Sequence, residues 1–531
     1  MNRQYEKRRN NMLQDQGNSE NRNWRRKGGL PLLTVTGLLA ALLMSGCTRQ
    51  TATEEPTQTS AAEESESAVV PPKPGESGTA GEIDPSKATT EEPTTISPFP
   101  NGSDGELGKD GEFSGETDET KEEQEPEEEP ELSVILATDI HYLSRDLTDG
   151  GLGFQYMVEH GDGKVVTYIE EITDAFVDEV IDRNPDVVIL SGDLTLDGEK
   201  KSHEELAEKL YEIEDAGIPV LVIPGNHDIN NHHAAKFQGE ERLPAEFTTP
   251  TEFREIYRHF GYDEAISEDD TSLSYVYELD EDTRFLMLDT CQYRQKALVG
   301  GAILSDTYDW IEEMLEDAWD DGADVIPVGH HNLLDESEIY VDDCTIEHSE
   351  QLVDMLEEWD VPLFLSGHLH VQHNKRSEEG RGIWEMVTSS LATPACQFGV
   401  LSYWHGGSFS YRTEELDVQG WAERNDVKEM DLLEFDKFKE PFLRRVFYNQ
   451  SYDALMKIDT LSEDQRLRMS NLYSDLNYHY YQGTAYKIRD AVLKNPDYQL
   501  WMGDGYASVL ADYVQYIIND AKRDYNEVRE D

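Results

Sequence analysis

Residues 219–228 read PVLVIPGNHD, a short apolar, β-branched run that ends at a glycine followed by three polar side chains. Such a run, bordered by proline and glycine, predicts a buried strand. The glycine allows a sharp turn, so Asn226, His227 and Asp228 can approach a common site closely. This stretch therefore predicts a strand that delivers polar groups to the space beyond its carboxyl end.

Four further polar motifs follow apolar runs in the same way. The runs at 132–138, 187–191, 325–328 and 363–366 precede the sequences DIH, GDLTLDG, GHH and GHLH. Between the first two runs lies a segment whose apolar residues repeat at helical spacing, namely Ile169, Ile172, Phe176 and Val180. Strands that alternate with helices predict an α/β fold, in which ligands bind beyond the carboxyl ends of the strands.

The five motifs carry the side chains that borderline transition metals bind. Carboxylate, amide and imidazole groups together suit Mn, Fe or Zn. Asp139 and His141 are two residues apart, so an extended backbone would point both side chains the same way. Each motif alone could be a turn or a hydrogen-bonded loop, but five in series behind apolar runs favour a metal site.

The series DIH, GDLTLDG, GNHD, GHH and GHLH resembles the calcineurin-like metallophosphoesterase superfamily. The resemblance covers about Leu132 to Arg412. Within the superfamily, the chain looks most like bacterial class III cyclic nucleotide phosphodiesterases that append a C-terminal helical domain. The resemblance implies a four-layer α/β/β/α sandwich followed by a small all-α domain.

The resemblance also implies a role for each motif position. The implied ligands are seven side chains: Asp139, His141 and His370 for one metal, Asn226, His330 and His368 for the other, and Asp193 bridging both. In the fourth motif the family ligand is the histidine after glycine, which selects His330 over His331. His227 would lie beside the substrate, with Asp228 orienting its ring. The cofactors would be two divalent or trivalent ions of Mn, Fe or Zn.

The implied reaction is hydrolysis of a phosphoric ester by a metal-bridging hydroxide, with His227 stabilising charge or protonating the leaving oxygen. Three functions stay open. A cyclic nucleotide phosphodiesterase is favoured, a phosphomonoesterase or nucleotidase of the same superfamily would use the same ligands, and a cell-surface tethered scaffold or adhesion protein would use the metal site only secondarily. Because the motifs are shared, substrate choice is expected in loops such as 144–163 and in the helical domain.

The first 131 residues predict targeting and tethering. A basic leader, an uncharged apolar run at 30–44 and Cys47 directly after Ser-Gly are typical of a secretory signal over residues 1–47. The end of this segment resembles a bacterial lipobox, so Cys47 is the expected lipidation site; an uncleaved membrane anchor is the alternative. Residues 48–131, rich in Thr, Ser, Glu and Pro, predict a disordered acidic linker. The expected location is the extracellular face of the bacterial cell membrane, held by lipid.

Composition limits the partners. The formal net charge is −66, and nucleic-acid binding requires Lys and Arg to neutralise phosphates, so a nucleic acid polymer is not expected as a partner. A small phosphoester and the membrane are expected instead. No disulfide or thiolate metal site is predicted for Cys291, Cys344 and Cys396.

Two folded domains are predicted, a metallophosphoesterase domain at 132–412 and a helical domain at 423–531. Ser462 and Gln465 have the spacing of a capping box at a helix start. The predicted helical stripes comprise Met469, Leu472, Tyr473, Leu476 and Tyr480 in one helix and Leu510, Tyr513, Val514 and Ile517 in another.

Overall fold

The structure is a computed structural model that describes residues 130–294, 296–339, 341–503 and 509–531. The predicted leader, Cys47 and nearly all of the predicted linker lie outside the described residues. Within the described ranges, no helix combines the length and apolar character that a membrane crossing needs.

The first of two large sheets contains the strands that precede the first three motifs. Its strands, in spatial order, are β15 (Glu527–Glu530), β14 (Ser408–Glu415), β13 (Gln397–Trp404), β1 (Leu132–Ala137), β2 (Val187–Ser191) and β3 (Val220–Ile223). β1, β2 and β3 are parallel neighbours, so their carboxyl ends meet at one edge of the sheet.

The second sheet contains the strands that precede the last two motifs. Its strands, in spatial order, are β11 (His373–Glu378), β12 (Arg381–Val387), β10 (Leu363–Ser366), β9 (Asp324–Gly329), β8 (Thr283–Leu288), β7 (Tyr275–Asp280) and β6 (Ser267–Glu268). β8, β9, β10 and β12 run parallel.

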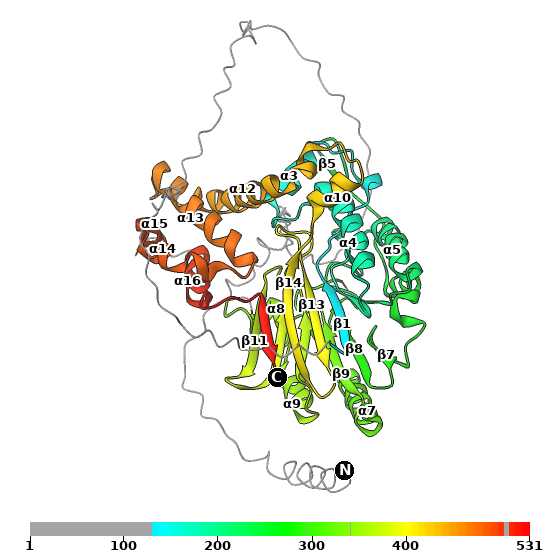
Figure 1. Cartoon of the computed structure of the whole chain (residues 1–531). Helices are drawn as coiled ribbons and strands as arrows, with labels where there is room; N and C mark the ends of the chain where they lie inside the picture. The colour runs from blue at the N-terminus through cyan, green and yellow to red at the C-terminus, as the bar shows by residue number, and fades with distance from the viewer. Residues whose placement is uncertain (1–129, 295, 340, 504–508) are drawn as a thin grey trace, which may run out of the picture. The chain divides into compact units, whose positions relative to one another are not determined.

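The two sheets face each other, with helices outside both (Figure 1). Along β8, Phe285 and Met287 belong to the core shared with the first sheet, whereas Leu286 and Leu288 pack in a second cluster with residues of two outer helices. The outer helices are α7 (Ser305–Asp321) and α9 (Glu350–Glu358) on the second sheet, and α4 (Ile169–Arg183) and α5 (Lys200–Asp215) on the first. The predicted α/β/β/α sandwich is confirmed.

Smaller elements connect these layers. They are η3 (Arg145–Leu147), α3 (Leu152–His160), η4 (Val166–Tyr168), the hairpin β4 (Ala235–Gln238) and β5 (Glu241–Pro244), α6 (Pro250–Ile256), η5 (Arg258–Tyr262) and α8 (Val341–Cys344).

The C-terminal region is helical, as predicted. Its elements are α10 (Val418–Arg424), α11 (Met430–Leu433), α12 (Phe435–Leu455), α13 (Glu463–Tyr481), η6 (Ala485–Lys487), α14 (Arg489–Lys494), α15 (Pro496–Trp501) and α16 (Val509–Asp520). The predicted capping box starts α13, because Ser462 Oγ accepts from the backbone N–H of Gln465 and the Gln465 side chain accepts from that of Ser462. Both predicted apolar stripes are buried.

One element of this region was not predicted. The described chain ends in a strand, β15, which pairs antiparallel with β14 of the first sheet, so the region is not purely helical. Val528 is buried while Glu527 and Arg529 are exposed, the alternation of a half-covered strand. A four-residue strand of mostly charged residues carries too weak an apolar pattern to be recognised in the sequence.

Candidate metal centre

All five motifs lie beyond the carboxyl ends of parallel strands. Asp139 and His141 follow β1, Asp193 follows β2, and the GNHD segment follows β3. In the second sheet, the GHH segment follows β9 and the GHLH segment follows β10. The seven predicted ligands are all buried, with exposed fractions of 7% or less.

The backbone conformation at several of these residues differs from the one expected. Five of the predicted ligands have left-handed backbone angles, namely Asp139 (φ 53°), His141 (φ 49°), Asp193 (φ 48°), His368 (φ 72°) and His370 (φ 58°). The expectation that an extended backbone aligns Asp139 with His141 is therefore wrong, although their side chains do converge. Left-handed angles cost non-glycine residues about 1–3 kcal/mol each, and such strain concentrates at functional sites.

The first cluster contains Asp139, His141 and His370, as predicted. His370 Nε2 lies 3.2 Å from Asp139 Oδ1 and 3.0 Å from His141 Nε2. His141 Nε2 lies 3.7 Å from Asp193 Oδ2. Asp139 Oδ1 and Asp193 Oδ2 are buried without a hydrogen-bond partner. Buried carboxylate oxygens need a donor or a cation, and these residues fit a metal ion.

The second cluster contains Asn226, His330 and His368. His330 Nδ1 lies 2.9 Å from the Ser191 carbonyl and His368 Nε2 lies 2.9 Å from the Asp343 carbonyl, so both nitrogens are assigned as donors. Each ring then turns a lone pair inward.

Those lone pairs meet a third acceptor. His330 Nε2 is 3.2 Å from His368 Nδ1 and 3.1 Å from Asn226 Oδ1. In the neutral rings these three atoms are all acceptors. Burial alone would lower the pKa of His330, but Asp193 raises it to about 9, so positive charge is favoured here, and a metal ion would satisfy all three atoms. The donor set fits a second metal ion.

Asp193 lies between the two clusters. Its Oδ1 is 3.5 Å from His330 Nε2, and its Oδ2 is 3.7 Å from His141 Nε2. Burial opposes charge on Asp193, but His330 and then His227 hold the pKa of this carboxyl well below its usual range. The carboxylate is thus ionised and lies between the two clusters, and bridging two metals is the role that the resemblance implies for it.

His331 also lies beside the second cluster, but its ring nitrogens are already engaged. Nδ1 is 2.8 Å from Thr290 Oγ1 and Nε2 is 2.8 Å from the Val299 carbonyl. The geometry therefore agrees with the choice of His330 as ligand.

Two motif glycines are required by close approach. A Cβ at Gly225 would lie 2.1 Å from the backbone N of Asp193, and one at Gly192 would lie 2.6 Å from His330 Nδ1. Any side chain at either position would displace a ligand, which explains why glycine precedes these ligands.

His227 borders the centre without joining either cluster. Its Nδ1 lies 2.7 Å from the Leu196 carbonyl and 3.2 Å from Asp197 Oδ1, while its Nε2 lies 4.0 Å from Asp193 Oδ2. Burial alone would lower the pKa of His227, but Asp193 and the hydrogen bond to Asp197 raise it to about 9. The ring can therefore carry a proton that faces the site.

The prediction that Asp228 orients the His227 ring is wrong. The Asp228 carboxylate accepts from the backbone N–H groups of Leu194, Thr195 and Gly225 and so joins the second motif to the third. Asp197 contacts the ring instead. Asp197 belongs to the GDLTLDG motif, but the sequence did not indicate that its side chain turns toward His227.

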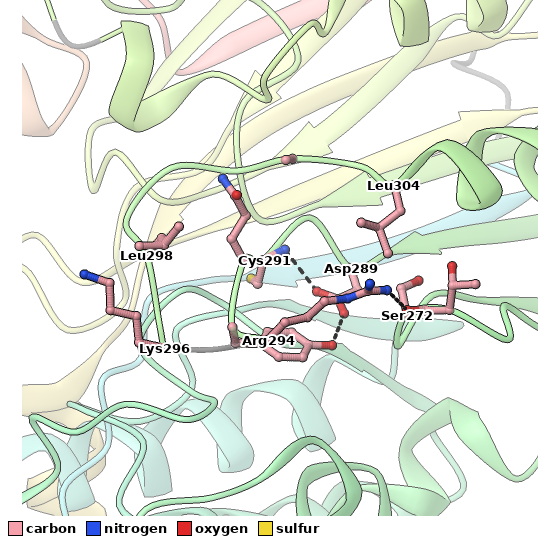
Figure 2. A pocket seen from close by; sticks show the side chains of 11 residues that line it. Ser272, Asp289, Cys291, Arg294, Lys296, Leu298 and Leu304 are labelled. Carbon is pink, nitrogen blue, oxygen red and sulfur yellow. Dashed lines mark hydrogen bonds between the residues drawn. The ribbon is translucent and has the colours of Figure 1, made fainter.

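A pocket of about 310 Å³ is lined by residues of the loops before β7 and after β8 (Figure 2). Most of its lining follows β8, where Asp289 accepts from the backbone N–H of Cys291 and where Arg294 and Lys296 add positive charge. The Cys291 thiol donates to the Pro224 carbonyl, one residue before the GNHD segment. This hydrogen bond connects one wall of the pocket to the loop of the third motif.

Comparison with known proteins identifies two domains. Residues 132–372 match the family model described as calcineurin-like phosphoesterase, and residues 417–524 match that of the C-terminal domain of cyclic nucleotide phosphodiesterase.

Three curated relatives share the name "probable cyclic nucleotide phosphodiesterase". One from Synechococcus is 26% identical over 40% of this chain and 66% of its own length. One from Moraxella catarrhalis is 21% identical over 36% of this chain and 60% of its own length. One from Vesicomyosocius okutanii is 42% identical over 12% of this chain and 26% of its own length. The chain thus spans less than two thirds of each relative.

A solved structure of a dimetal phosphatase from Danio rerio aligns with 54% of this chain and 97% of its own, at 13% identity and a TM-score of 0.41. From the two family matches, the chain carries a calcineurin-like phosphoesterase domain followed by a C-terminal domain of the cyclic nucleotide phosphodiesterase type.

Proposed function

We propose that this protein is a metal-dependent phosphoric diester hydrolase acting on cyclic nucleotides. The observation that carries the hydrolase proposal is the placement of the Asp193 carboxylate between two buried acceptor clusters, with His227 alongside. The cyclic nucleotide class is supported by the names of the relatives and by the family of the C-terminal domain.

The residues divide the chemical work. Two cations held by the clusters would supply water activated at neutral pH and would neutralise charge on the phosphoryl group. His227 is fixed through Nδ1 by the Leu196 carbonyl and Asp197, so its Nε2 can hold a proton toward the substrate and pass it to the leaving oxygen. Asp228 keeps the second and third motifs in register.

The pocket lined by the loop after β8 is the proposed place for the organic part of the substrate. Its volume of about 310 Å³ is within the range of small-molecule sites, and Arg294 and Lys296 offset the acidity of the chain locally. A phosphomonoesterase would use the same ligands, and the experiment below distinguishes the two.

A substrate panel on the purified full-length protein tests this proposal. We expect turnover of bis-p-nitrophenyl phosphate and of 2′,3′- or 3′,5′-cyclic nucleotides to exceed that of p-nitrophenyl phosphate, and chelation to abolish all of it. Added Mn, Fe or Zn should restore activity. Faster cleavage of the monoester would favour a nucleotidase, and no hydrolysis at all would favour a tethered scaffold.

We also propose that a lipid on Cys47 holds the catalytic domain at the outer face of the cell membrane. The proposal is supported by the basic leader, the apolar run and the Ser-Gly-Cys ending. Cys47→Ala is expected to leave the precursor unprocessed or to release protein into the medium, as measured by fractionation and mass spectrometry. A wild-type mature chain that starts elsewhere and carries no lipid would contradict it.

A further inference from the structure

Arg242 contacts the aspartate that lies against the His227 ring, and the chemistry above does not use it. It lies on β5, the second strand of the hairpin that follows the GNHD segment. Its Nη2 donates to Asp197 Oδ2 at 2.7 Å and to the His233 carbonyl at 2.7 Å. One guanidinium nitrogen therefore joins the hairpin to the second motif and to the loop after the third motif.

The two oxygens of the Asp197 carboxylate face different partners. Oδ2 accepts from Arg242, whereas Oδ1 lies 3.2 Å from His227 Nδ1. A hydrogen bond between a guanidinium and a carboxylate is charge-assisted, and the carboxylate is planar, so fixing one oxygen limits where the other can lie. Arg242 thus restricts the direction in which Asp197 meets the ring.

A second carboxyl group makes the position of Asp197 depend on a cation. Glu199 is fully buried, and its Oε2 accepts from the backbone N–H of Asp197 at 3.0 Å. Burial first, and the Asp197 carboxylate second, raise the pKa of Glu199 to about 7. Neighbouring carboxylates repel each other, and the Asp197 side chain is 18% exposed. Without Arg242, the Asp197 carboxylate would therefore turn toward water and away from the ring.

The hairpin is attached at its base and at its tip, so it can hold Arg242 in place. At the base, Glu199 Oε1 accepts from the backbone N–H of Ala235, the first residue of β4, at 3.0 Å. At the tip, the Asp149 carboxylate accepts from the backbone N–H of Gly239 at 2.8 Å. Helix α3 lies against both strands of the hairpin (Figure 1). The arginine is thus carried by an element with several attachments to the catalytic domain.

We propose that Arg242 is a positioning residue of the reaction, which holds the Asp197 carboxylate against His227 Nδ1. The hairpin β4–β5 then sets the direction in which His227 Nε2 faces the substrate. This role rests on the proposed function, in which His227 passes a proton to the leaving oxygen. Because Arg242 acts through Asp197, its loss should change kcat and leave KM and metal content as they are.

Arg242→Ala is expected to lower kcat for a cyclic nucleotide about tenfold, the size of one hydrogen bond to a charged group. The loss should be smaller for bis-p-nitrophenyl phosphate, because p-nitrophenolate needs less help from a proton donor. Arg242→Lys should recover most of the rate, because an ammonium can still pair with Asp197. In an Asp197→Asn background, Arg242→Ala should cost no further rate, because both substitutions remove the same contact.

Arg254→Ala is the matched control. The Arg254 side chain is 34% exposed, as is that of Arg242, and its Nη2 pairs with Glu268 at 2.8 Å. Glu268 belongs to β6, the last strand of the second sheet. Loss of this pair should leave kcat for both substrates unchanged. Equal losses on both substrates for Arg242→Ala, with a lowered melting temperature, would assign Arg242 to structure alone and overturn the proposal.

A nuclear magnetic resonance spectrum of the His227 ring tests the same contact without turnover. In full-length protein with isotope-labelled histidine, the His227 Nδ1–H signal is the one that His227→Gln removes. We expect this signal to shift in Arg242→Ala and to stay in place in Arg254→Ala.

The two measurements separate this proposal from the proposed function. If the wild type hydrolyses phosphoesters while Arg242→Ala changes neither the His227 signal nor the rates, the role of Arg242 fails and the function stands. If the wild type hydrolyses none of the panel while the signal shifts in Arg242→Ala, Arg242 still positions the ring and the function fails.

Discussion

Asp193→Ala is expected to remove metal and activity together. Its two carboxylate oxygens face different clusters, so the substitution takes a ligand from both metals at once. Loss of even a second-shell partner costs about 10- to 100-fold in metal affinity, and loss of a shared ligand should cost more than about 100-fold. Elemental analysis of the purified variant beside the wild type, with turnover of bis-p-nitrophenyl phosphate, measures both effects.

Asp186→Ala is the matched control for Asp193. Asp186 precedes the same strand, β2, at its other end, where its carboxylate accepts from the backbone N–H and hydroxyl of Ser133. Metal content and turnover should remain as in the wild type. An Asp193→Ala protein that keeps two metals and its rate would contradict the two-metal site.

His227→Ala is expected to keep most of the metal and to lose rate in a way that depends on the leaving group. General-acid help is worth about 100- to 10,000-fold, and a ribose oxygen needs that proton more than p-nitrophenolate, which is already a stable anion. The ratio of the two rate losses, measured with a cyclic nucleotide and bis-p-nitrophenyl phosphate, reports the proton donor directly.

The neighbouring aspartates provide controls for His227. Asp197→Asn should show the same leaving-group pattern with a smaller loss, because the Leu196 carbonyl still holds the ring. Asp228→Asn should lower stability instead, because its carboxylate accepts from several buried N–H groups. Equal losses on both substrates together with depleted metal would reassign His227 to holding its loop.

The strands and their polar ends could be predicted because both depend on local pattern. Apolar runs such as 187–191 and 363–366 are buried on both faces, so continuous hydrophobicity identifies them. The predicted ligands come directly after such runs in the sequence, and the structure brings Asp139, His141 and His370 together as predicted. The substrate class does not follow in this way, because the same ligands serve diesters and monoesters.

Other features were hidden because they depend on contacts far apart in the sequence. The left-handed angles at Asp139 and His141 are imposed by the surrounding fold and leave no local signature. The direction of Asp197 toward His227 is set by where two loops meet. Lys164 looks like a surface lysine in the sequence, whereas the folded chain buries it.

The short strand β15 has a consequence for solubility. Without it, the edge of β14 would present unpaired N–H and C=O groups, which are a template for pairing with another chain. β15 covers that edge with Glu527, Arg529 and Glu530, and charged residues on an outermost strand disfavour further strand addition. The end of the C-terminal region thus pairs with the first sheet and protects the edge of that sheet against aggregation.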